Sequence, residues 1–394
     1  MLPFNLDQEN CTGCSACYSV CPINCISMIR DEEGFLYPIS DDTCLKCGLC
    51  ERVCPIITPK QLKNDMHDCY AAISKNYNLW KNSTSGGAFS EICNAWCDEK
   101  TLVIGAAWDK FIVHHIGVIG PSQISSLRKS KYVESAIEGV FKNAKMYLDN
   151  GGKVLFCGTP CQVSGLRSFL RKDYNSLFTI DLICHGVGSQ KVFEKCIKYY
   201  EREAGEKVNQ FEFRAKRDKY ETDYLSLIST ESTTRYLVND RYSQLFLNQL
   251  CLRPSCGKNC KFRNTDRQGD ITLADFKGLN KVFSRLGGEQ YNYSTIVFNN
   301  EKGKSIFVQL QKTMNLYVCK IEDIIKYNPL FAGQTWHNSQ RDAFFIDFKA
   351  SPLDSIEKWT HKEEDFKQSS KRKLFNSLPK KIRVLISMIY TCIK

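Results

Sequence analysis

The sequence predicts a small α+β module at the N-terminus, followed by an α/β body with a mixed sheet and an antiparallel extension. Three patterns support this fold class. Two similar cysteine-rich strings occupy residues 11–22 and 44–55. Between 153 and 204, apolar strands alternate with helices, which is typical of parallel strand pairing. From residue 208 the strands become shorter and alternate apolar with polar residues, which favours antiparallel pairing.

The two cysteine strings share one spacing. They read CTGCSACYSVCP and CLKCGLCERVCP, each of them Cys-x2-Cys-x2-Cys-x3-Cys-Pro. In the bacterial two-cluster ferredoxins, three cysteines of such a run hold one 4Fe-4S cluster and the fourth reaches across to the other. The module is therefore predicted to be ferredoxin-like. We assign the first cluster to Cys11, Cys14, Cys17 and Cys54, and the second to Cys21, Cys44, Cys47 and Cys50.

A zinc site and a disulfide framework are the alternatives for so many cysteines. Zinc sites use four ligands in two pairs separated by a long gap, which two repeats of this run do not resemble. The 21 cysteines follow no secretory signal, because residues 1–10 lack a basic flank and an apolar stretch. We therefore expect a reducing, cytoplasmic location, where thiols serve metal and redox chemistry.

Composition sets further limits on the class of protein. A chain of 394 residues can form two or three domains, and 43% hydrophobic with 25% charged residues is ordinary for a globular protein. Apolar runs long enough to span a membrane are missing from the sequence. The formal charge of +11 is partly offset if thiolates bind iron. Because no groove-reading motif accompanies the basic residues, we do not expect a nucleic-acid partner.

Four segments follow from these patterns. Residues 1–60 form the two-cluster domain, 61–150 and 151–350 the two parts of the body, and 351–394 a basic tail. The tail contains eight basic and no acidic residues from Lys367 onward. It suits an amphipathic helix on an anionic membrane surface or a terminal helix docked on the protein, and composition does not decide between them. The first alternative adds peripheral contact at the inner membrane face to the cytoplasmic location.

The first part of the body is predicted to contain strands at 69–74, 102–108 and 111–119, and helices at 88–97 and 135–149. Ser85, Gly86 and Gly87 precede the first helix, where backbone N–H groups can hold a phosphate, although a plain turn is the alternative. Lys131 and Tyr132 belong to a basic, hydroxyl-bearing patch. We expect Cys93 and Cys97 to be core residues.

The second part alternates strand 153–157, helix 162–171, strand 177–184 and helix 189–204. In α/β sheets, ligands bind at the carboxyl ends of the strands. Cys161 and Cys184 fall at those ends, so we expect them to face one another across a crevice. Because Cys161 lies at a helix N-terminus, its pKa is predicted to be lowered, which favours metal ligation or redox reactivity.

Shorter strands follow at 210–216, 224–230 and 235–238, then a helix at 242–250 and a loop that carries Cys256 and Cys260. Loop cysteines beside a strand end are expected to be ligands rather than core residues. A further strand is predicted at 293–298 and a helix at 303–312.

Six ordered motifs resemble the coenzyme F420 hydrogenase/dehydrogenase beta-subunit family, here with the ferredoxin-like module fused in front. They are Ser85-Gly86-Gly87, Ser130-Lys131-Tyr132, Leu155 to Gln162, Asp181 to Gly186, Leu252 to Cys260 and Gly269 to Phe276. The resemblance implies FAD, a third 4Fe-4S cluster and, in the best-known members, hydride transfer between a deazaflavin and the iron-sulfur chain.

Carried over residue by residue, the resemblance implies two sites. Cys161, Cys184, Cys256 and Cys260 become the ligands of the third cluster, and Ser85, Gly86, Gly87, Lys131 and Tyr132 the flavin or substrate pocket. The last motif departs from the family, because this chain has Cys-x3-Cys where Cys-x2-Cys is usual. That departure concerns the ligand set rather than the family.

Redox chemistry supports a flavin independently of the resemblance. Hydride carriers move two electrons whereas a 4Fe-4S cluster moves one, and a flavin, unlike a nicotinamide, connects the two. The expected function is an iron-sulfur flavoprotein oxidoreductase that moves electrons between 4Fe-4S clusters, FAD and a two-electron organic substrate. A reductase of a surface-polysaccharide or other metabolic pathway and a non-catalytic electron-transfer subunit remain open. The expected partners are a redox partner protein or ferredoxin and a small-molecule substrate.

Overall fold

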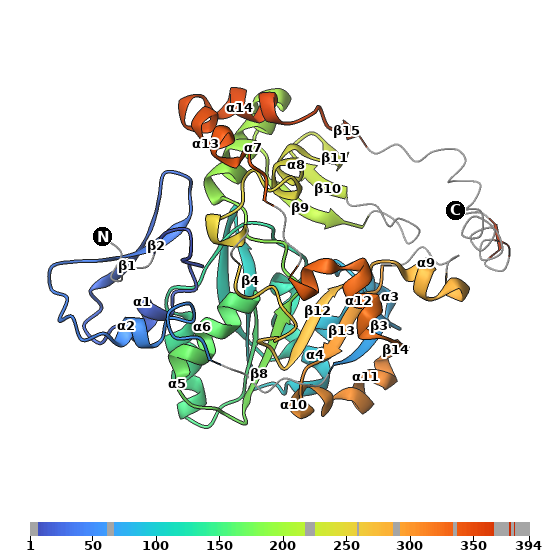
Figure 1. Ribbon diagram of the computed structural model, residues 1–394. Helices are drawn as coiled ribbons and strands as arrows, with labels where there is room; N and C mark the ends of the chain where they lie inside the picture. Colours follow the sequence, from blue (N-terminus) through green and yellow to red (C-terminus); the bar gives the residue numbers. More distant parts are fainter. Residues whose placement is uncertain are drawn as a thin grey trace.

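The computed structural model describes residues 7–60, 67–216, 225–257, 260–286, 292–333 and 337–365, with residues 378, 379 and 382. Three parts are visible: a small N-terminal module, a nine-stranded mixed sheet with helices, and a four-stranded antiparallel sheet (Figure 1). This arrangement confirms the predicted fold class. The predicted tail helix lies outside the described residues, apart from three isolated positions. Among the described helices, none is long and apolar enough to cross a membrane.

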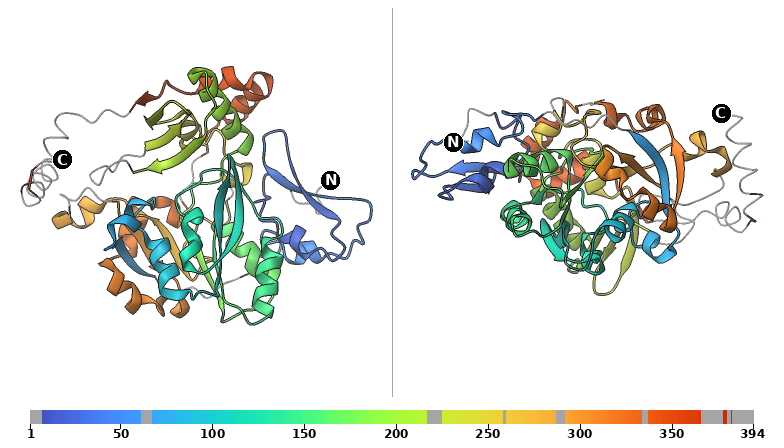
Figure 2. Two further views of the ribbon diagram at one scale, coloured as in Figure 1. Left: turned by 180° about the vertical axis from the view of Figure 1, so that it is seen from behind. Right: turned by 90° about the horizontal axis from the view of Figure 1, so that it is seen from below.

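The N-terminal module contains one hairpin and two short helices. The strands β1 (Ile26–Arg30) and β2 (Leu36–Ser40) pair antiparallel, and the helices are α1 (Ala16–Val20) and α2 (Leu49–Arg52). Both helices begin within a cysteine string, after a residue in the left-handed conformation. In Figures 1 and 2 the module lies beside α5 (Val140–Asp149) and α6 (Pro160–Leu170), and α1 packs against both helices.

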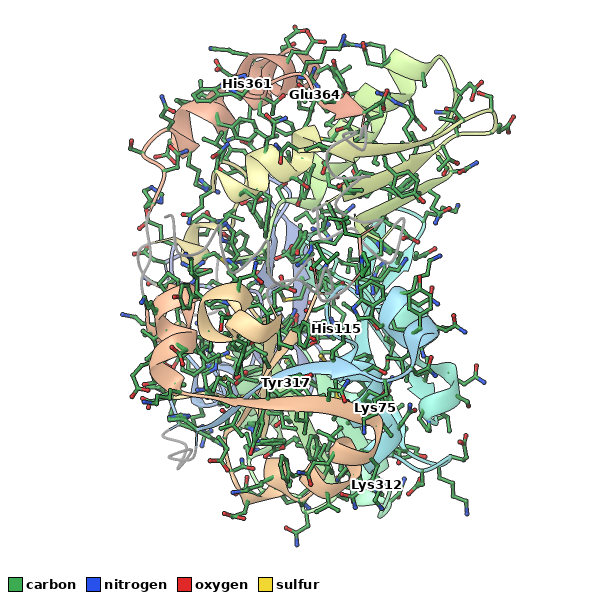
Figure 3. All side chains as sticks on the ribbon, turned by 90° about the vertical axis from the view of Figure 1, so that its right-hand side faces the viewer. Lys75, His115, Lys312, Tyr317, His361 and Glu364 are labelled. Atoms are coloured by element: carbon green, nitrogen blue, oxygen red, sulfur yellow. The ribbon has the colours of Figure 1, made fainter. Side chains whose placement is uncertain are left out.

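The large sheet has the order β14-β3-β13-β12-β8-β7-β4-β5-β6. Its four central strands, β12, β8, β7 and β4, are parallel, as the strand–helix alternation predicts. Figure 3 looks onto the β14 edge, on which Tyr317 is labelled, while His361 and Glu364 mark the upper layer. The strands in chain order are β3 (Asp68–Ser74), β4 (Leu102–Asp109), β5 (Ile112–Ile119), β6 (Ser135–Ala136), β7 (Val154–Cys157), β8 (Leu177–Leu182), β12 (Ile271–Asp275), β13 (Ser294–Phe298) and β14 (Met314–Cys319).

Helices cover both faces of this sheet because its strands are apolar on both sides. Along β7, Val154 and Phe156 pack with α5 and α6, whereas Leu155 packs on the other face with α4 (Ala88–Trp96). Cys93 of α4 is fully buried there, which confirms its prediction as a core residue, and Cys97 packs against the same cluster. The remaining helices around the sheet are α3 (Tyr77–Lys81), α9 (Leu279–Val282), α10 (Glu301–Lys304), α11 (Phe307–Thr313) and α12 (Ile321–Tyr327).

Two predicted helices differ from the structure. The helix predicted over 135–149 begins only at Val140, because residues 135–136 pair with β5 as strand β6. The Ser135 hydroxyl forms a 2.7 Å hydrogen bond with Nδ1 of buried His115, and a contact so distant in sequence overrides local helix propensity. The helix predicted over 303–312 is divided into α10 and α11.

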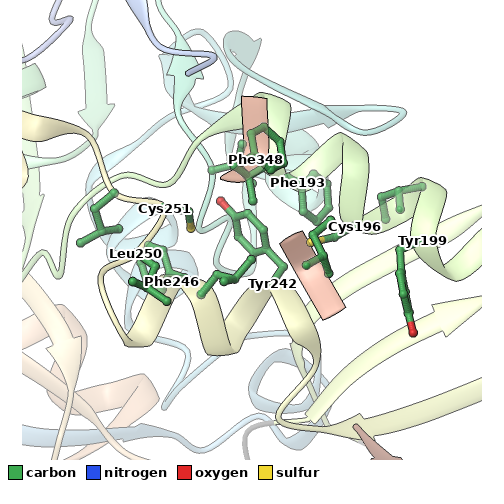
Figure 4. Close-up of a cluster of buried hydrophobic side chains, with 14 of the residues drawn as sticks. Phe193, Cys196, Tyr199, Tyr242, Phe246, Leu250, Cys251 and Phe348 are labelled. Carbon is green, nitrogen blue, oxygen red and sulfur yellow. The ribbon is translucent and has the colours of Figure 1, made fainter. Parts of the chain in front are cut away.

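The antiparallel extension is a second sheet with its own core. Its order is β15-β11-β10-β9. Phe193, Tyr242, Phe246 and Phe348 from three helices meet in its core together with Cys196 and Cys251 (Figure 4). The elements are α7 (Gln190–Ala204), β9 (Gln210–Ala215), β10 (Leu225–Ser229), β11 (Thr234–Val238), α8 (Arg241–Leu247), α13 (Arg341–Ala350), α14 (Pro352–Trp359) and β15 (Glu364–Asp365).

A buried polar network fixes β12 beside β8. The Asp181 carboxylate is fully buried and accepts hydrogen bonds from the Gly269 N–H (3.0 Å) and the Arg267 guanidinium (2.9 Å). A Cβ on Gly269 would lie 2.6 Å from the Asp181 nitrogen, so only glycine fits there. Asp181 and Gly269 therefore have a structural role. They tie the loop that carries Cys256 and Cys260 to the strand that leads to Cys184.

Candidate functional site

The four cysteines assigned to the first ferredoxin-type cluster meet in the structure. All are buried, and they line one hollow together with Met28, Pro38, Pro55 and Ile56. Burial, with smaller contributions from the neighbouring Cys54 and Cys11 thiols, raises the pKa of Cys14 to about 12. A hollow with apolar walls and four converging thiols suits a cofactor that binds them as thiolates. The assigned members are Cys11, Cys14, Cys17 and Cys54.

The second set lies closer to solvent. Cys21 is buried, Cys44 and Cys50 are half-buried, and Cys47 is exposed. The structure adds a cysteine that the sequence analysis did not assign, because Cys25 Sγ lies 3.4 Å from Cys21 Sγ. Cys25 is outside the repeated spacing, and its position four residues after Cys21 was the signal available in the sequence.

The four cysteines of the body also come together, from three separate segments of the chain. Cys161 begins helix α6, Cys184 follows β8, and Cys256 ends the 3-10 turn η2 (Pro254–Cys256) four residues before Cys260. Burial raises the pKa of Cys161 well above its ordinary value, and the other three thiols raise it further. The prediction of a lowered pKa is therefore wrong, because burial outweighs the helix terminus.

The first cysteine set lines a hollow. Within the described residues, groups of three or more His, Cys, Asp or Glu side chains that could hold a single metal ion are absent. A cuboidal cluster instead needs thiols spread around its corners.

The body cysteines lie next to the first ferredoxin-type set. One helical turn after Cys161, Gly165 faces the module so closely that a Cβ there would lie 2.9 Å from Cys14 Cβ and 3.0 Å from its sulfur. On the other side, Arg253 Nε donates a 2.7 Å hydrogen bond to the Cys11 carbonyl, three residues before Cys256. Arg253 is thus close to Cys11 of the first set and to Cys256 of the body set.

A buried ion pair holds the module in this position. The fully buried Arg253 side chain pairs with Glu134 at 2.5 Å and donates a 2.9 Å hydrogen bond to the Leu36 carbonyl. Glu134 in turn accepts from the Leu36 N–H at 2.8 Å and from Arg30 at 3.1 Å. At the hairpin tip, Arg341 of α13 pairs with Glu33. These contacts link the module to both sheets of the body.

Lys131, Arg214 and Lys216 gather at the carboxyl ends of the parallel strands, and we call these three residues the cationic group. Arg214 of β9 pairs with Asp275 at the end of β12 and donates to the Tyr132 hydroxyl at 3.3 Å. Burial lowers the pKa of Lys131 to about 8, and its amino group donates a 2.6 Å hydrogen bond to the Arg128 carbonyl.

Lys216 of the cationic group contacts the predicted Ser-Gly-Gly turn. Its Nζ donates hydrogen bonds to the carbonyls of Ser85 (2.6 Å) and Trp80 (2.8 Å) and lies 4.0 Å from the centre of the Trp80 ring. Burial lowers the pKa of Lys216 to about 6. Within the described part of the chain, neither Lys216 nor Lys131 has a carboxylate in ion-pair range. Lys131 therefore keeps most of its charge near neutral pH, whereas Lys216 becomes a cation only at about pH 6 and below unless a bound anion raises its pKa. Arg214 and Lys216 were missed because nothing local in the sequence marks them.

The Ser-Gly-Gly turn itself is more tightly packed than predicted. The Gly86 N–H donates a 2.9 Å hydrogen bond to Ser294 Oγ, and the Ser85 hydroxyl donates to the Tyr293 carbonyl at 2.6 Å. A Cβ on Gly86 would lie 2.1 Å from the Ala72 carbonyl oxygen. Gly87, with φ of +91°, caps helix α4. Close packing explains why residue 86 is a glycine. Its N–H is already used in the hydrogen bond to Ser294 and is not available to a ligand.

The fold and the cysteine sets define an iron-sulfur protein in which a ferredoxin-type module is docked on an α/β body. Comparison with known families agrees with this class. Residues 10–56 match the 4Fe-4S dicluster domain, which supports two 4Fe-4S clusters. Residues 151–324 match the family described as the C-terminal part of the coenzyme F420 hydrogenase/dehydrogenase beta subunit. The predicted resemblance is thereby confirmed, although residues 85–87 and 130–132 lie outside both matched ranges.

Solved structures were also compared with this chain. A chain of the F420-reducing NiFe hydrogenase complex from Methanosarcina barkeri is similar over 76% of this chain and 93% of that chain, with 16% identity and a TM-score of 0.44. Among curated proteins, the comparison gave no match.

Proposed function

We propose that the chain is an iron-sulfur flavoprotein oxidoreductase that moves electrons between a two-electron organic substrate, FAD and three 4Fe-4S clusters. The family match supports a substrate of the coenzyme F420 type. One observation supports the proposal: Cys184, Cys256 and Cys260 lie close enough to Cys161 for their charges to act on it, and Gly165 and Arg253 bring these segments against the ferredoxin-type module.

In this proposal the four body cysteines hold the third cluster. The body shields them from solvent, since all four are at least half-buried. The Cys-x3-Cys spacing is compatible with the set, because the charge of Cys260 acts on each of the other three thiols. The Asp181 network holds the two loops that carry Cys184 and the last two cysteines.

The cationic group is the proposed flavin site. A flavin takes two electrons from an organic substrate and releases them one at a time to iron-sulfur centres. Lys131 would attract the FAD diphosphate, because no described carboxylate neutralises it. Lys216 would join it once the bound phosphate raises the pKa of the Lys216 amine. Tyr132, held by Arg214, would line the same pocket. An electron-transfer subunit without a substrate would have no use for these buried cations.

The path to the outside runs through the module. Gly165 brings the helix of Cys161 against Cys14, so the first ferredoxin-type set adjoins the body, whereas the second set, with exposed Cys47, faces solvent. We therefore expect a redox partner protein or ferredoxin to exchange electrons at the second set.

Iron and flavin content test this proposal. Anaerobically purified and reconstituted protein should contain about 12 iron atoms and about one FAD per chain, since each cluster holds four irons. Cys161→Ser and Cys256→Ser should each lower the iron content by about four. Cys196→Ser, in the buried core of the second sheet, is the matched control and should leave it unchanged.

Two results would contradict the proposal. An unchanged iron content in both variants would remove the third cluster. About eight iron atoms without flavin in the unmodified chain would reduce the function to electron relay.

A further inference from the structure

A buried arginine lies beside the four body cysteines. Arg263 follows Cys260 by three residues and is 5% exposed. Two of its guanidinium nitrogens donate to backbone carbonyls, Nε to that of Cys184 at 3.2 Å and Nη2 to that of His185. The remaining nitrogen, Nη1, is buried and has no hydrogen-bond partner among the described residues. The guanidinium is therefore held against the backbone of one body cysteine with one nitrogen unpaired.

The described carboxylates leave the charge of Arg263 uncompensated. A guanidinium stays protonated in proteins, and a buried charge without a partner is strongly unfavourable. The carbonyls of Cys184 and His185 orient the side chain but carry no net charge. Arg267, four residues later, differs in this respect, because it pairs with the buried Asp181 carboxylate at 2.9 Å. Arg263 forms no such ion pair with the part of the chain that the structure describes.

The charge of Arg263 acts on two cysteines from different segments. Burial raises the pKa of Cys184, and Arg263 opposes this increase more than any other group. Burial also raises the pKa of Cys256 to about 12, and Arg263 again acts in the opposite direction. Burial and then Arg263 lower the pKa of His185 to about 4, so this neighbour is neutral at neutral pH. A fixed positive charge therefore lies close to two of the four thiols.

We propose that Arg263 is the counter-charge of the third cluster and raises its reduction potential. This inference rests on the third 4Fe-4S cluster of the proposed function. Four thiolates bound to iron form an anionic site, and one electron from the flavin adds one further negative charge to it. Arg263 would stabilise that added charge, because net charge and hydrogen bonds near the sulfurs set the potential of such clusters. Arg263 acts through the ligands and is thus a positioning residue.

A purely structural role is the competing explanation. Arg263 also ties the loop that carries Cys260 to the backbone after β8, through the carbonyls of Cys184 and His185. Only the counter-charge role depends on the positive charge itself. Lysine keeps this charge but lacks the planar fork of donors, whereas methionine lacks both. Variants with these two side chains therefore separate the two roles.

A redox titration of the reconstituted full-length protein, followed by electron paramagnetic resonance, tests the proposal. The third-cluster signal is the one that Cys161→Ser removes. Arg263→Met should keep the iron content, whereas the ratio of reduced to oxidised third cluster at a fixed potential should fall about tenfold, which is about 59 mV for one electron. Arg263→Lys should keep a ratio close to that of the unmodified chain. Lys261→Met, which removes an exposed charge two residues earlier, is the matched control and should leave the ratio unchanged.

An unchanged ratio in Arg263→Met would overturn the proposal. An equal fall in Arg263→Met and Arg263→Lys would also overturn it, because the donor fork would then be responsible. If Arg263→Met loses the third cluster, about four irons, retention of the cluster and its potential in Arg263→Lys supports the counter-charge, and loss in both variants contradicts it. Failure of the third-cluster proposal is distinguishable, since the unmodified chain would then hold about eight irons and Cys161→Ser would remove no signal.

Discussion

The contact between module and body makes a quantitative prediction for Arg253→Met. The substitution keeps much of the side-chain volume but removes a fully buried guanidinium that pairs with Glu134 and donates to the carbonyls of Cys11 and Leu36. Removing one partner of a buried ion pair typically costs about 3–5 kcal/mol, because the other charge stays buried. Glu134 keeps Arg30 and the Leu36 N–H, so we expect the lower end, about 3 kcal/mol.

Hydrogen exchange of the hairpin measures this loss directly. The Leu36 N–H is bonded to Glu134 and is protected only while the module stays docked. A loss of about 3 kcal/mol should speed its exchange by roughly 100-fold, at tenfold per 1.4 kcal/mol. The double variant Arg253→Met/Glu134→Gln, which removes the stranded charge, should recover part of the protection.

An exposed ion pair supplies the control. Arg235 pairs with Asp365 at 2.8 Å, and both side chains are about half exposed. Arg235→Met should therefore change the stability by less than about 1 kcal/mol and leave Leu36 exchange unaltered. If Arg253→Met behaves like Arg235→Met, the buried pair does not hold the module and the reasoning is refuted.

Three further predictions concern the cationic group, the contact of helix α6 with the module, and the packing of β12 beside β8. FAD affinity should fall as the pH rises through about 8, because Lys131 loses its proton and its attraction for phosphate; titration of Lys131→Ala should show weaker binding without this dependence. Gly165→Val should slow electron transfer into the module at unchanged iron content, because a Cβ would lie 2.9 Å from Cys14 Cβ; stopped-flow absorbance checks this against Ser164→Ala. Gly269→Ala should lower the free energy of unfolding by more than about 2 kcal/mol in thermal denaturation, and an unchanged midpoint would contradict the packing argument.

Local patterns in the sequence were sufficient for the module and the parallel strands. The repeated cysteine spacing predicted which thiols of the first set would meet, including Cys54 of the second string, because in this run the fourth cysteine reaches across to the other cluster. The alternation around Val154 and Leu177 predicted parallel pairing of β7 and β8, since apolar strands joined by a helix have few other arrangements.

Contacts between distant residues were beyond such patterns. Strand β6 depends on its pairing with β5, and Arg253 meets Glu134 across 119 positions of the chain. Lys216 contacts Ser85, which is 131 positions away in the chain, so the cationic group could not be recognised from the residues next to it in the sequence. The pKa of Cys161 was predicted in the wrong direction because burial, which the sequence does not display, exceeds the effect of the helix terminus.

The central claim is that electrons pass from FAD at the cationic group, through a cluster held by the four body cysteines, into the ferredoxin-type module. Freeze-quench electron paramagnetic resonance after photoreduction of bound FAD tests it most directly, with the unmodified chain compared with Cys161→Ser. The account predicts that the ferredoxin-type clusters become reduced in the unmodified chain, whereas in Cys161→Ser the flavin is reduced and the clusters stay oxidised. Reduction of those clusters at the same rate in Cys161→Ser would contradict it.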